Sequence, residues 1–194
     1  MAHKFDPKNR HKLDSEKRRE MLPPVKTLMS LGLKEEDIVA DIGCGIGFFT
    51  ITAAEIVGEK GKVFAMDISK EMLDEVENKV KENNILNIET VLTNENDLKL
   101  KDGKVSFAFI SQVLHESEDL NKFLNEIKRI ICRKGKIAIV EWQKIEGEFG
   151  PALDHRIDKA DLIKKLASLG FSNIESLDIG KDFYGLTAQK FWIK

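Results

Sequence analysis

Val39-Ala-Asp-Ile-Gly-Cys-Gly-Ile-Gly-Phe-Phe-Thr50 is the stretch that decides the fold of this chain. The apolar residues 38–42 predict a buried parallel strand, and residues 48–57 predict a helix that ends at Gly58. The glycines at positions 43, 45 and 47 join the two elements. Glycine adopts backbone angles closed to other residues and lets a ligand touch the main chain. The turn therefore brings a small molecule against the N-terminus of the following helix.

A second strand, residues 62–67, ends at Asp67, about 20 residues beyond Gly47. At this spacing a carboxylate accepts hydrogen bonds from both hydroxyls of a ribose. The alternative role of Asp67 is to cap the next helix, but Ser69 can already do this. The pattern therefore predicts a site for an adenosine-containing ligand whose ribose is bound by Asp67.

The glycine spacing separates two kinds of adenosine cofactor. The nicotinamide fingerprint Gly-x-Gly-x-x-Gly needs a glycine at position 48, where this chain has Phe48. Asp41, just before the loop, would repel a pyrophosphate but suits the cationic methionine end of S-adenosylmethionine. Together these residues resemble the first motif of class I S-adenosylmethionine-dependent methyltransferases, Asp-x-Gly-x-Gly-x-Gly. The resemblance covers about residues 25–194.

The resemblance assigns a role to each residue of this loop. The backbone around Gly43, Gly45 and Gly47, with Cys44 as a small residue between them, would contact the methionine end of the cofactor. Asp41 would help to hold its ammonium group. Ile68, next to Asp67, would pack on the adenine.

Three further positions follow the third and fourth predicted strands. Relatives carry an aspartate and a small residue where this chain has Asn94 and Glu95. The amide oxygen of Asn94 can accept from the adenine amine, and a solvated turn asparagine is the equal alternative. The resemblance places backbone carbonyls from the turn that begins at Ser111 near the cofactor's ammonium group. His115 could take a proton from an acceptor, or could simply fill the loop.

Strands and helices alternate along the rest of the chain. Helical stripes span residues 70–80, 120–131 and 159–169, with Ser69 and Asp158 as caps and a turn around Gly135 after the second stripe. Strands are expected at 88–92, 105–110 and 136–142, which predicts a parallel sheet covered on both faces. The last two strands, 173–179 and 184–193, are too close in sequence for a crossover and must pair antiparallel.

The resemblance completes this outline. It implies an α/β, three-layer Rossmann-like sandwich with a seven-stranded, mostly parallel sheet of order 3-2-1-4-5-7-6, in which strand 7 is antiparallel. The strand order comes from the resemblance, since spacing alone does not establish it.

Two segments lie outside this core pattern. Residues 1–24 are polar, with seven Lys/Arg against four Asp/Glu, and are expected to form a lid or cap on a methyltransferase domain of residues 25–194. Residues 143–157 form a long connection that leaves the ligand-binding edge of the sheet, so they are the second candidate wall of an acceptor pocket. Within this connection, His155 and Arg156 could bind an acidic acceptor, but a solvated loop is the favoured expectation.

Composition limits the partners. The chain has 194 residues, 42% of them hydrophobic, and a net charge of −2, which gives no general attraction to nucleic acid or anionic membranes. Cys44 and Cys132 show no metal-ligand spacing, and no apolar run approaches the ~18 residues of a membrane span. We expect a cytoplasmic protein with no metal, no membrane association and no nucleic-acid partner. The sequence does not determine the oligomeric state.

We therefore predict a methyltransferase that moves the methyl group of S-adenosylmethionine to a small-molecule acceptor by in-line displacement. The acceptor and the methylated atom (O, N, S or C) stay open, as does the use of a general base. Two alternatives remain at this point. One is a non-catalytic S-adenosylmethionine-binding regulatory module, which needs the same cofactor residues, and the other is a nicotinamide-dependent oxidoreductase, which the residue at position 48 disfavours.

Overall fold

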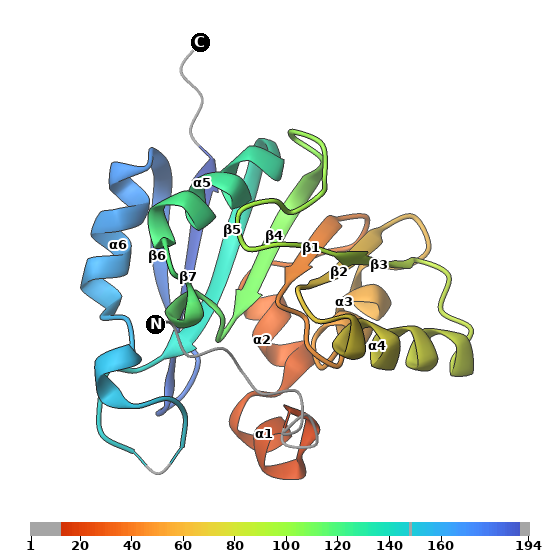
Figure 1. The fold of residues 1–194 in the computed structure, drawn as a ribbon, viewed down its shortest axis with the longest axis horizontal. Coiled ribbons are helices and arrows are strands. Elements are labelled where there is room, and N and C mark those ends of the chain that lie inside the picture. The colour runs from red at the N-terminus through yellow and green to blue at the C-terminus, as the bar shows by residue number, and fades with distance from the viewer. Residues whose placement is uncertain (1–12, 148, 191–194) are drawn as a thin grey trace.

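Strand β1 (Ile38–Ile42) occupies the middle of a seven-stranded sheet in the computed structural model, which describes residues 13–147 and 149–190. The strand order is β3-β2-β1-β4-β5-β7-β6 (Figure 1). Neighbouring strands from β3 to β5 are parallel, whereas β7 is antiparallel to both β5 and β6. The expected topology, including the antiparallel seventh strand, is confirmed.

The remaining strands are β2 (Lys62–Asp67), β3 (Ile88–Leu92), β4 (Val105–Ser111), β5 (Ile131–Trp142), β6 (Phe171–Asp178) and β7 (Phe183–Lys190). The α-helices are α1 (Glu16–Met21), α2 (Pro24–Ser30), α3 (Thr50–Val57), α4 (Lys70–Glu82), α5 (Leu120–Ile130) and α6 (Lys159–Ser168). The 3-10 helices η2 (Leu114–Glu116) and η3 (Leu153–His155) lie in loops. The predicted end of the last strand, residues 191–193, lies outside the described residues.

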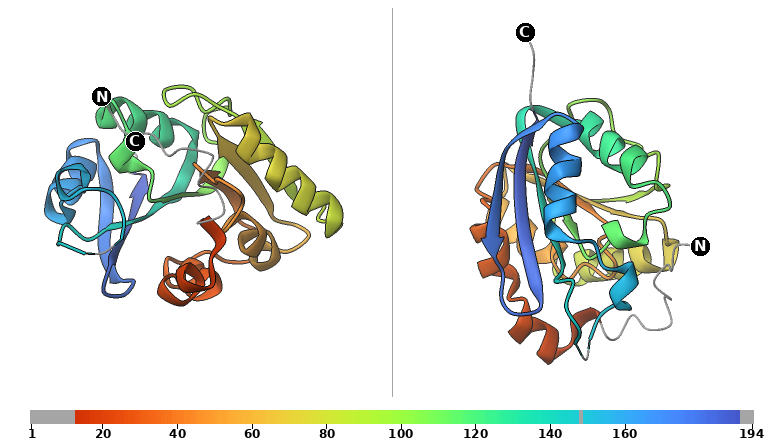
Figure 2. Two further views of the ribbon diagram at one scale, coloured as in Figure 1. Left: turned by 60° about the horizontal axis from the view of Figure 1, so that its bottom comes forward. Right: turned by 90° about the vertical axis from the view of Figure 1, so that its left-hand side faces the viewer.

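Alternating side chains along the strands build two apolar layers, because successive residues of a strand point to opposite faces of the sheet. Val39 and Phe107 pack with α2 and α3 on one face. Ala40 and Ala108 pack with α5 and α6 on the other face. Figure 2 shows the helices on the two sides of the sheet, which gives the three layers of the expected sandwich.

Side-chain caps fix the starts of the longer helices. Ser69 accepts a hydrogen bond from the backbone N–H of Met72, and Asp158 accepts from two backbone N–H groups of α6. Both caps were predicted, and each satisfies backbone donors that have no partner within the helix. Helix α3 begins at Thr50, two residues after the predicted start, and Gly47, with a φ of 82°, lies outside it.

The prediction of a turn around Gly135 is wrong. Helix α5 ends at Ile130, and β5 starts at once with Ile131 and runs through Gly135 to Trp142. The pairing of β4 with β5 shifts register between Val105 and Phe107, and Lys134 has a φ of 68°. A Cβ at Gly135 would lie 2.9 Å from the Ser106 carbonyl oxygen. The glycine thus permits close approach of the backbones at an irregular point of the sheet, rather than ending an element.

The described part of the N-terminal segment consists of a helix without fully buried side chains, followed by residues that join the core. Helix α1 has no fully buried side chain. Leu22, directly after it, is fully buried with Leu28 and Leu31 in the α2–α3 layer. Pro24 occupies the first turn of α2, where its missing N–H is tolerated. The division of the chain at residues 24 and 25 stays a prediction, and residues 1–12 lie outside the described part.

None of the described helices has the length and apolar character needed to span a membrane.

Two leucine substitutions test this core. Leu124 in α5 is fully buried, so Leu124→Ala should lower the free energy of unfolding by about 2–5 kcal/mol, through lost apolar contacts and a cavity. Leu86 is 96% exposed, so Leu86→Ala, the matched control, should change it by less than about 0.5 kcal/mol. Urea unfolding followed by circular dichroism measures both. Equal losses would show that α5 does not pack as described.

Candidate functional site

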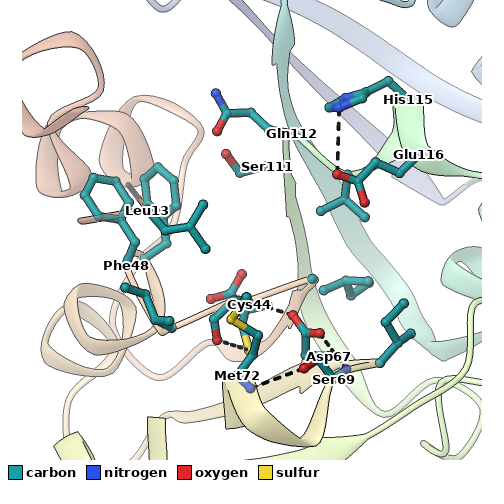
Figure 3. A pocket seen from close by; sticks show the side chains of 18 of the residues that line it. Leu13, Cys44, Phe48, Asp67, Ser69, Met72, Ser111, Gln112, His115 and Glu116 are labelled. Atoms are coloured by element: carbon teal, nitrogen blue, oxygen red, sulfur yellow. Dashed lines mark hydrogen bonds and ion pairs between the residues drawn. The ribbon is translucent and has the colours of Figure 1, made fainter. Parts of the chain in front are cut away.

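A pocket of about 1120 Å³ opens at the carboxyl ends of the central strands. This is the edge at which open parallel sheets bind ligands. The wall includes the loop after β1, the ends of β2, β4 and β5, helix α1 and part of the connection after β5. Figure 3 shows Ser111, Gln112 and His115 on one side, facing Cys44, Asp67 and Ser69 on the other.

The glycine loop after β1 is a tight cradle. Its first residues are fixed by hydrogen bonds from the N–H groups of Gly43 and Cys44 to the carbonyl oxygen of Met66, at 2.8 and 3.0 Å. Gly43 has a φ of 71°, and a Cβ added to it would lie 2.4 Å from a methyl carbon of Val113. Only glycine fits this backbone and this space. The missing side chain of Gly43 thus makes room for Val113, and the backbone of the loop lines the pocket.

Asp67 ties the end of β2 to this loop. One carboxylate oxygen accepts from the N–H of Gly45 at 2.9 Å, and the other accepts from the N–H of Ser69 at 2.8 Å. Burial raises the pKa of Asp67, while these backbone donors oppose the rise. A carboxylate offers about four acceptor positions, so two remain for ribose hydroxyls while the backbone fixes its orientation. The free acceptor positions of Asp67 fit the predicted contact with the ribose hydroxyls.

Asp41, at the end of β1, is a buried carboxylate in the pocket wall. It accepts a hydrogen bond from the Thr50 hydroxyl at 2.6 Å. Burial raises its pKa to about 7, and the charge of Asp67 adds to this, whereas Thr50 and Arg18 lower it. A cation placed beside Asp41 would favour its charged form. The buried carboxylate of Asp41 therefore suits the ammonium group of a ligand.

The other predicted residues are brought to the same cavity, with one exception. Cys44, Ile68, Asn94, Glu95 and Ser111 all line the pocket, whereas Gly47 is not part of its lining. The Ser111 hydroxyl is buried and has no hydrogen-bond partner among the described residues, so it keeps unused hydrogen-bonding capacity at the pocket wall.

Glu95 is engaged elsewhere. Its carboxylate accepts from the Ser117 hydroxyl at 2.6 Å and from the N–H of Glu118 at 2.9 Å, which ties it to the segment before α5. Asn94 forms a small bridge with Asp97 through the backbone. The proposed adenine contacts of both residues stay predictions.

His115 is held by a glutamate that the sequence left without a role. Its Nδ1 lies 3.0 and 3.2 Å from the two carboxylate oxygens of Glu141, which is fully buried near the end of β5. Burial lowers the pKa of His115, but the hydrogen bond and charge of Glu141 outweigh it, so the pKa lies above 6.5. The only sequence signal for this pair was a charged residue inside an otherwise apolar strand.

Helix α1 and the connection after β5 meet over the pocket. The ammonium of Lys17 lies 3.7 Å from the ring centre of Phe149, and both residues line the cavity. Arg156 is 6% exposed and donates to the carbonyl oxygens of Gln143, Ile145, Phe149 and Pro151. The expectation of a solvated Arg156 is therefore wrong, because its guanidinium satisfies the backbone of the connection and fixes its path.

The fold and the pocket define a class of protein. A glycine cradle preceded by Asp41 and followed by Asp67, on a sheet of this order, is that of a class I S-adenosylmethionine-dependent methyltransferase. A sequence model of the ubiE/COQ5 methyltransferase family matches residues 19–152, and the chain belongs to this family. S-adenosylmethionine is the cofactor of the class, so the nicotinamide alternative is set aside.

Relatives and solved structures agree with this assignment. The chain is 34% identical to a SAM-dependent methyltransferase from Aquifex aeolicus, with a TM-score of 0.92 over 97% of this chain and 100% of that one. It is 31% identical to the demethylmenaquinone methyltransferase of Bacillus velezensis over 121 residues. This aligned region covers 62% of this chain and 52% of that protein. The chain thus spans about half the length of the curated relatives it matches.

A structure of the phosphoethanolamine N-methyltransferase 2 of Haemonchus contortus with S-adenosyl-L-methionine shares the fold. Its TM-score is 0.73 at 15% identity, over 87% of this chain and 52% of that one.

Removing the Asp67 carboxylate tests the ribose contact. Asp67→Ala should weaken S-adenosylhomocysteine binding by at least ~10-fold, because charge-assisted hydrogen bonds are worth about 1.5–3 kcal/mol each and 1.4 kcal/mol is a factor of ten. Asp74→Ala, which removes an exposed carboxylate of α4 paired with Lys70, should leave affinity unchanged. Titration calorimetry measures both. Unchanged affinity in the Asp67 variant would mean that the ribose lies elsewhere.

Proposed function

We propose that this chain transfers the methyl group of S-adenosylmethionine to an aromatic small-molecule acceptor by direct in-line displacement. The observation that carries the proposal is one continuous pocket with two chemically different sides. Asp67 and the glycine loop lie over β2 and β1, whereas Trp142 and Phe183 lie at β5 and β7. Three strand spacings separate β2 from β5, about 14 Å at about 4.8 Å each.

The size of the pocket supports two ligands. Sites for one small ligand usually measure about 300–1,000 Å³, and this cavity is about 1120 Å³. Aromatic side chains of β5, β7 and the connection after β5 line the side away from the cofactor loop: Trp142, Phe183 and Phe149. Such walls suit a flat apolar ring. The relatives named demethylmenaquinone methyltransferases support a quinone-type ring as the acceptor.

The chemistry needs alignment more than activation by the protein. When bound, S-adenosylmethionine supplies an electrophilic methyl group on a positively charged sulfur. The residues of the chain orient the cofactor through the glycine loop and Asp67, and the aromatic walls hold the acceptor and exclude water. In this proposal His115, held by Glu141, accepts a proton from the acceptor.

Cofactor turnover tests the proposal against a non-catalytic binding module. We expect calorimetry to show binding of S-adenosylmethionine and S-adenosylhomocysteine, with no binding of NAD. S-adenosylhomocysteine should then form when demethylmenaquinone is added in its chemically reduced quinol form, because the electron-rich ring is the better nucleophile. Tight binding with no product from the quinol or from cell extract would favour the regulatory module.

The His115–Glu141 pair predicts a pH dependence. Only the neutral imidazole can accept a proton, so kcat/KM should rise with pH through the raised pKa of His115. Glu141→Gln removes the charge that raises this pKa, so the rising limb should move to lower pH. His115→Asn should abolish the limb and lower kcat by about 10²–10⁴-fold.

Glu89→Gln is the matched control, because it removes an exposed carboxylate on β3 that pairs with Lys62. Its pH profile should equal that of the unmodified chain. A His115→Asn variant with full kcat would assign His115 to the loop structure only.

A further inference from the structure

Arg18 of helix α1 places a guanidinium in the pocket wall beside the cofactor loop. Its central carbon lies 4.6 Å from the ring centre of Phe48, the residue that follows Gly47. Leu13 approaches the same loop, with a methyl carbon 3.2 Å from where a Cβ on Gly45 would lie. The start of the described chain therefore covers the glycine loop, and Arg18 brings a positive charge to the pocket wall beside that loop.

The hydrogen bonds of Arg18 are incomplete. One terminal nitrogen donates to the side-chain oxygen of Gln112 at 2.8 Å. The Nε–H is buried and has no hydrogen-bond partner among residues 13–147 and 149–190. Buried donors in native proteins are nearly always paired, so the unpaired Nε–H leaves Arg18 with hydrogen-bonding capacity that a pocket ligand could use. Burial lowers the pKa of Arg18 to about 10, which leaves it fully charged at neutral pH.

Gln112 is held in an uncommon backbone conformation that serves this contact. Its φ is 59°, in the left-handed region that non-glycine residues rarely occupy, and its N–H donates to the Val140 carbonyl oxygen at 2.8 Å. Such strain collects at functional sites. Figure 3 shows the Gln112 side chain extending toward the side of the pocket where Leu13 lies.

The pocket thus offers both charges of a zwitterion. Asp41 supplies the anion at the end of β1, and Arg18 supplies the cation from α1, within electrostatic reach of each other. Among the described lining residues, Lys17 also carries a positive charge, but its ammonium lies against the ring of Phe149. An α-amino acid group carries one ammonium and one carboxylate, and it matches this pair.

We propose that Arg18 binds the carboxylate of the cofactor's amino-acid end, with Gln112 as the residue that positions the guanidinium. The inference rests on the proposed function, because it assigns a further contact in the same cofactor site. It also couples α1 to the cofactor, because a helix without fully buried side chains gains an ionic contact only when the carboxylate is present.

Calorimetry with two ligands isolates this contact. The ligands are S-adenosylhomocysteine and its decarboxylated analogue, which lacks only the carboxylate. We expect Arg18→Gln to weaken the first by about 10–100-fold and the second by less than about threefold, the size expected for a charge-assisted contact. Arg18→Lys should restore part of the affinity through charge alone. Lys26→Gln, which removes an exposed positive charge on α2 outside the pocket lining, is the matched control and should change neither affinity.

Hydrogen exchange gives a second readout. Amides of residues 16–21 should exchange more slowly with S-adenosylhomocysteine than with the decarboxylated analogue, and Arg18→Gln should remove this difference. Thermal unfolding of each variant checks that the fold is intact.

Each other outcome overturns the proposal. Equal loss for both ligands would show that Arg18 only supports the pocket wall, and no loss would show that it makes no contact. Unchanged affinity for S-adenosylhomocysteine with a raised KM for the acceptor would assign Arg18 to an acidic group on the acceptor. These results leave the proposed function standing, whereas failure of the unmodified chain to bind either ligand would overturn both.

Discussion

The hydrogen bond from the N–H of Gly45 to the carboxylate of Asp67 links the two halves of the cofactor site. It joins the loop after β1 to the end of β2, while the N–H groups at the start of the loop bond to the Met66 carbonyl. The cradle is therefore fixed by the neighbouring strand rather than by a ligand. A preformed cradle of this kind lowers the ordering cost of binding, because the loop does not have to be organised when the ligand arrives.

Buried charge is concentrated around this cradle. Asp41, Asp67 and Arg18 lie at one side, and the His115–Glu141 pair lies across the pocket over β4 and β5. Isolated buried charges are unfavourable, so each has at least one hydrogen-bond partner in the protein. Strongly shifted pKa values in a pocket mark functional groups more often than structural ones. Here burial is the largest cause of the pKa shifts of both Asp41 and Arg18. The two side chains have opposite charges, which suit a zwitterionic ligand.

The acceptor side is built from segments outside the repeating strand–helix pattern. The connection after β5 has a defined path because Arg156 donates to carbonyl oxygens along it, and Lys17 links it to α1 through Phe149. These contacts join parts of the chain that are far apart in sequence. They explain how a polar, glycine-containing connection forms a stable wall.

The sequence by itself determined the cofactor half of this protein. The glycines, Asp41 and Asp67 lie within one strand–loop–helix–strand unit, so local spacing and backbone chemistry were enough to predict their meeting. Strand and helix periodicity likewise predicted most elements from β1 onward, and the short connection between the last two strands predicted their antiparallel pairing. Tertiary structure decided the rest. Glu141 reaches His115, and Arg18 reaches Gln112, only because β4 and β5 pair and α1 folds over the glycine loop. Gly135 and Arg156 were misjudged for the same reason, since a backbone approach and a set of carbonyl partners come from distant residues and leave no periodic signal.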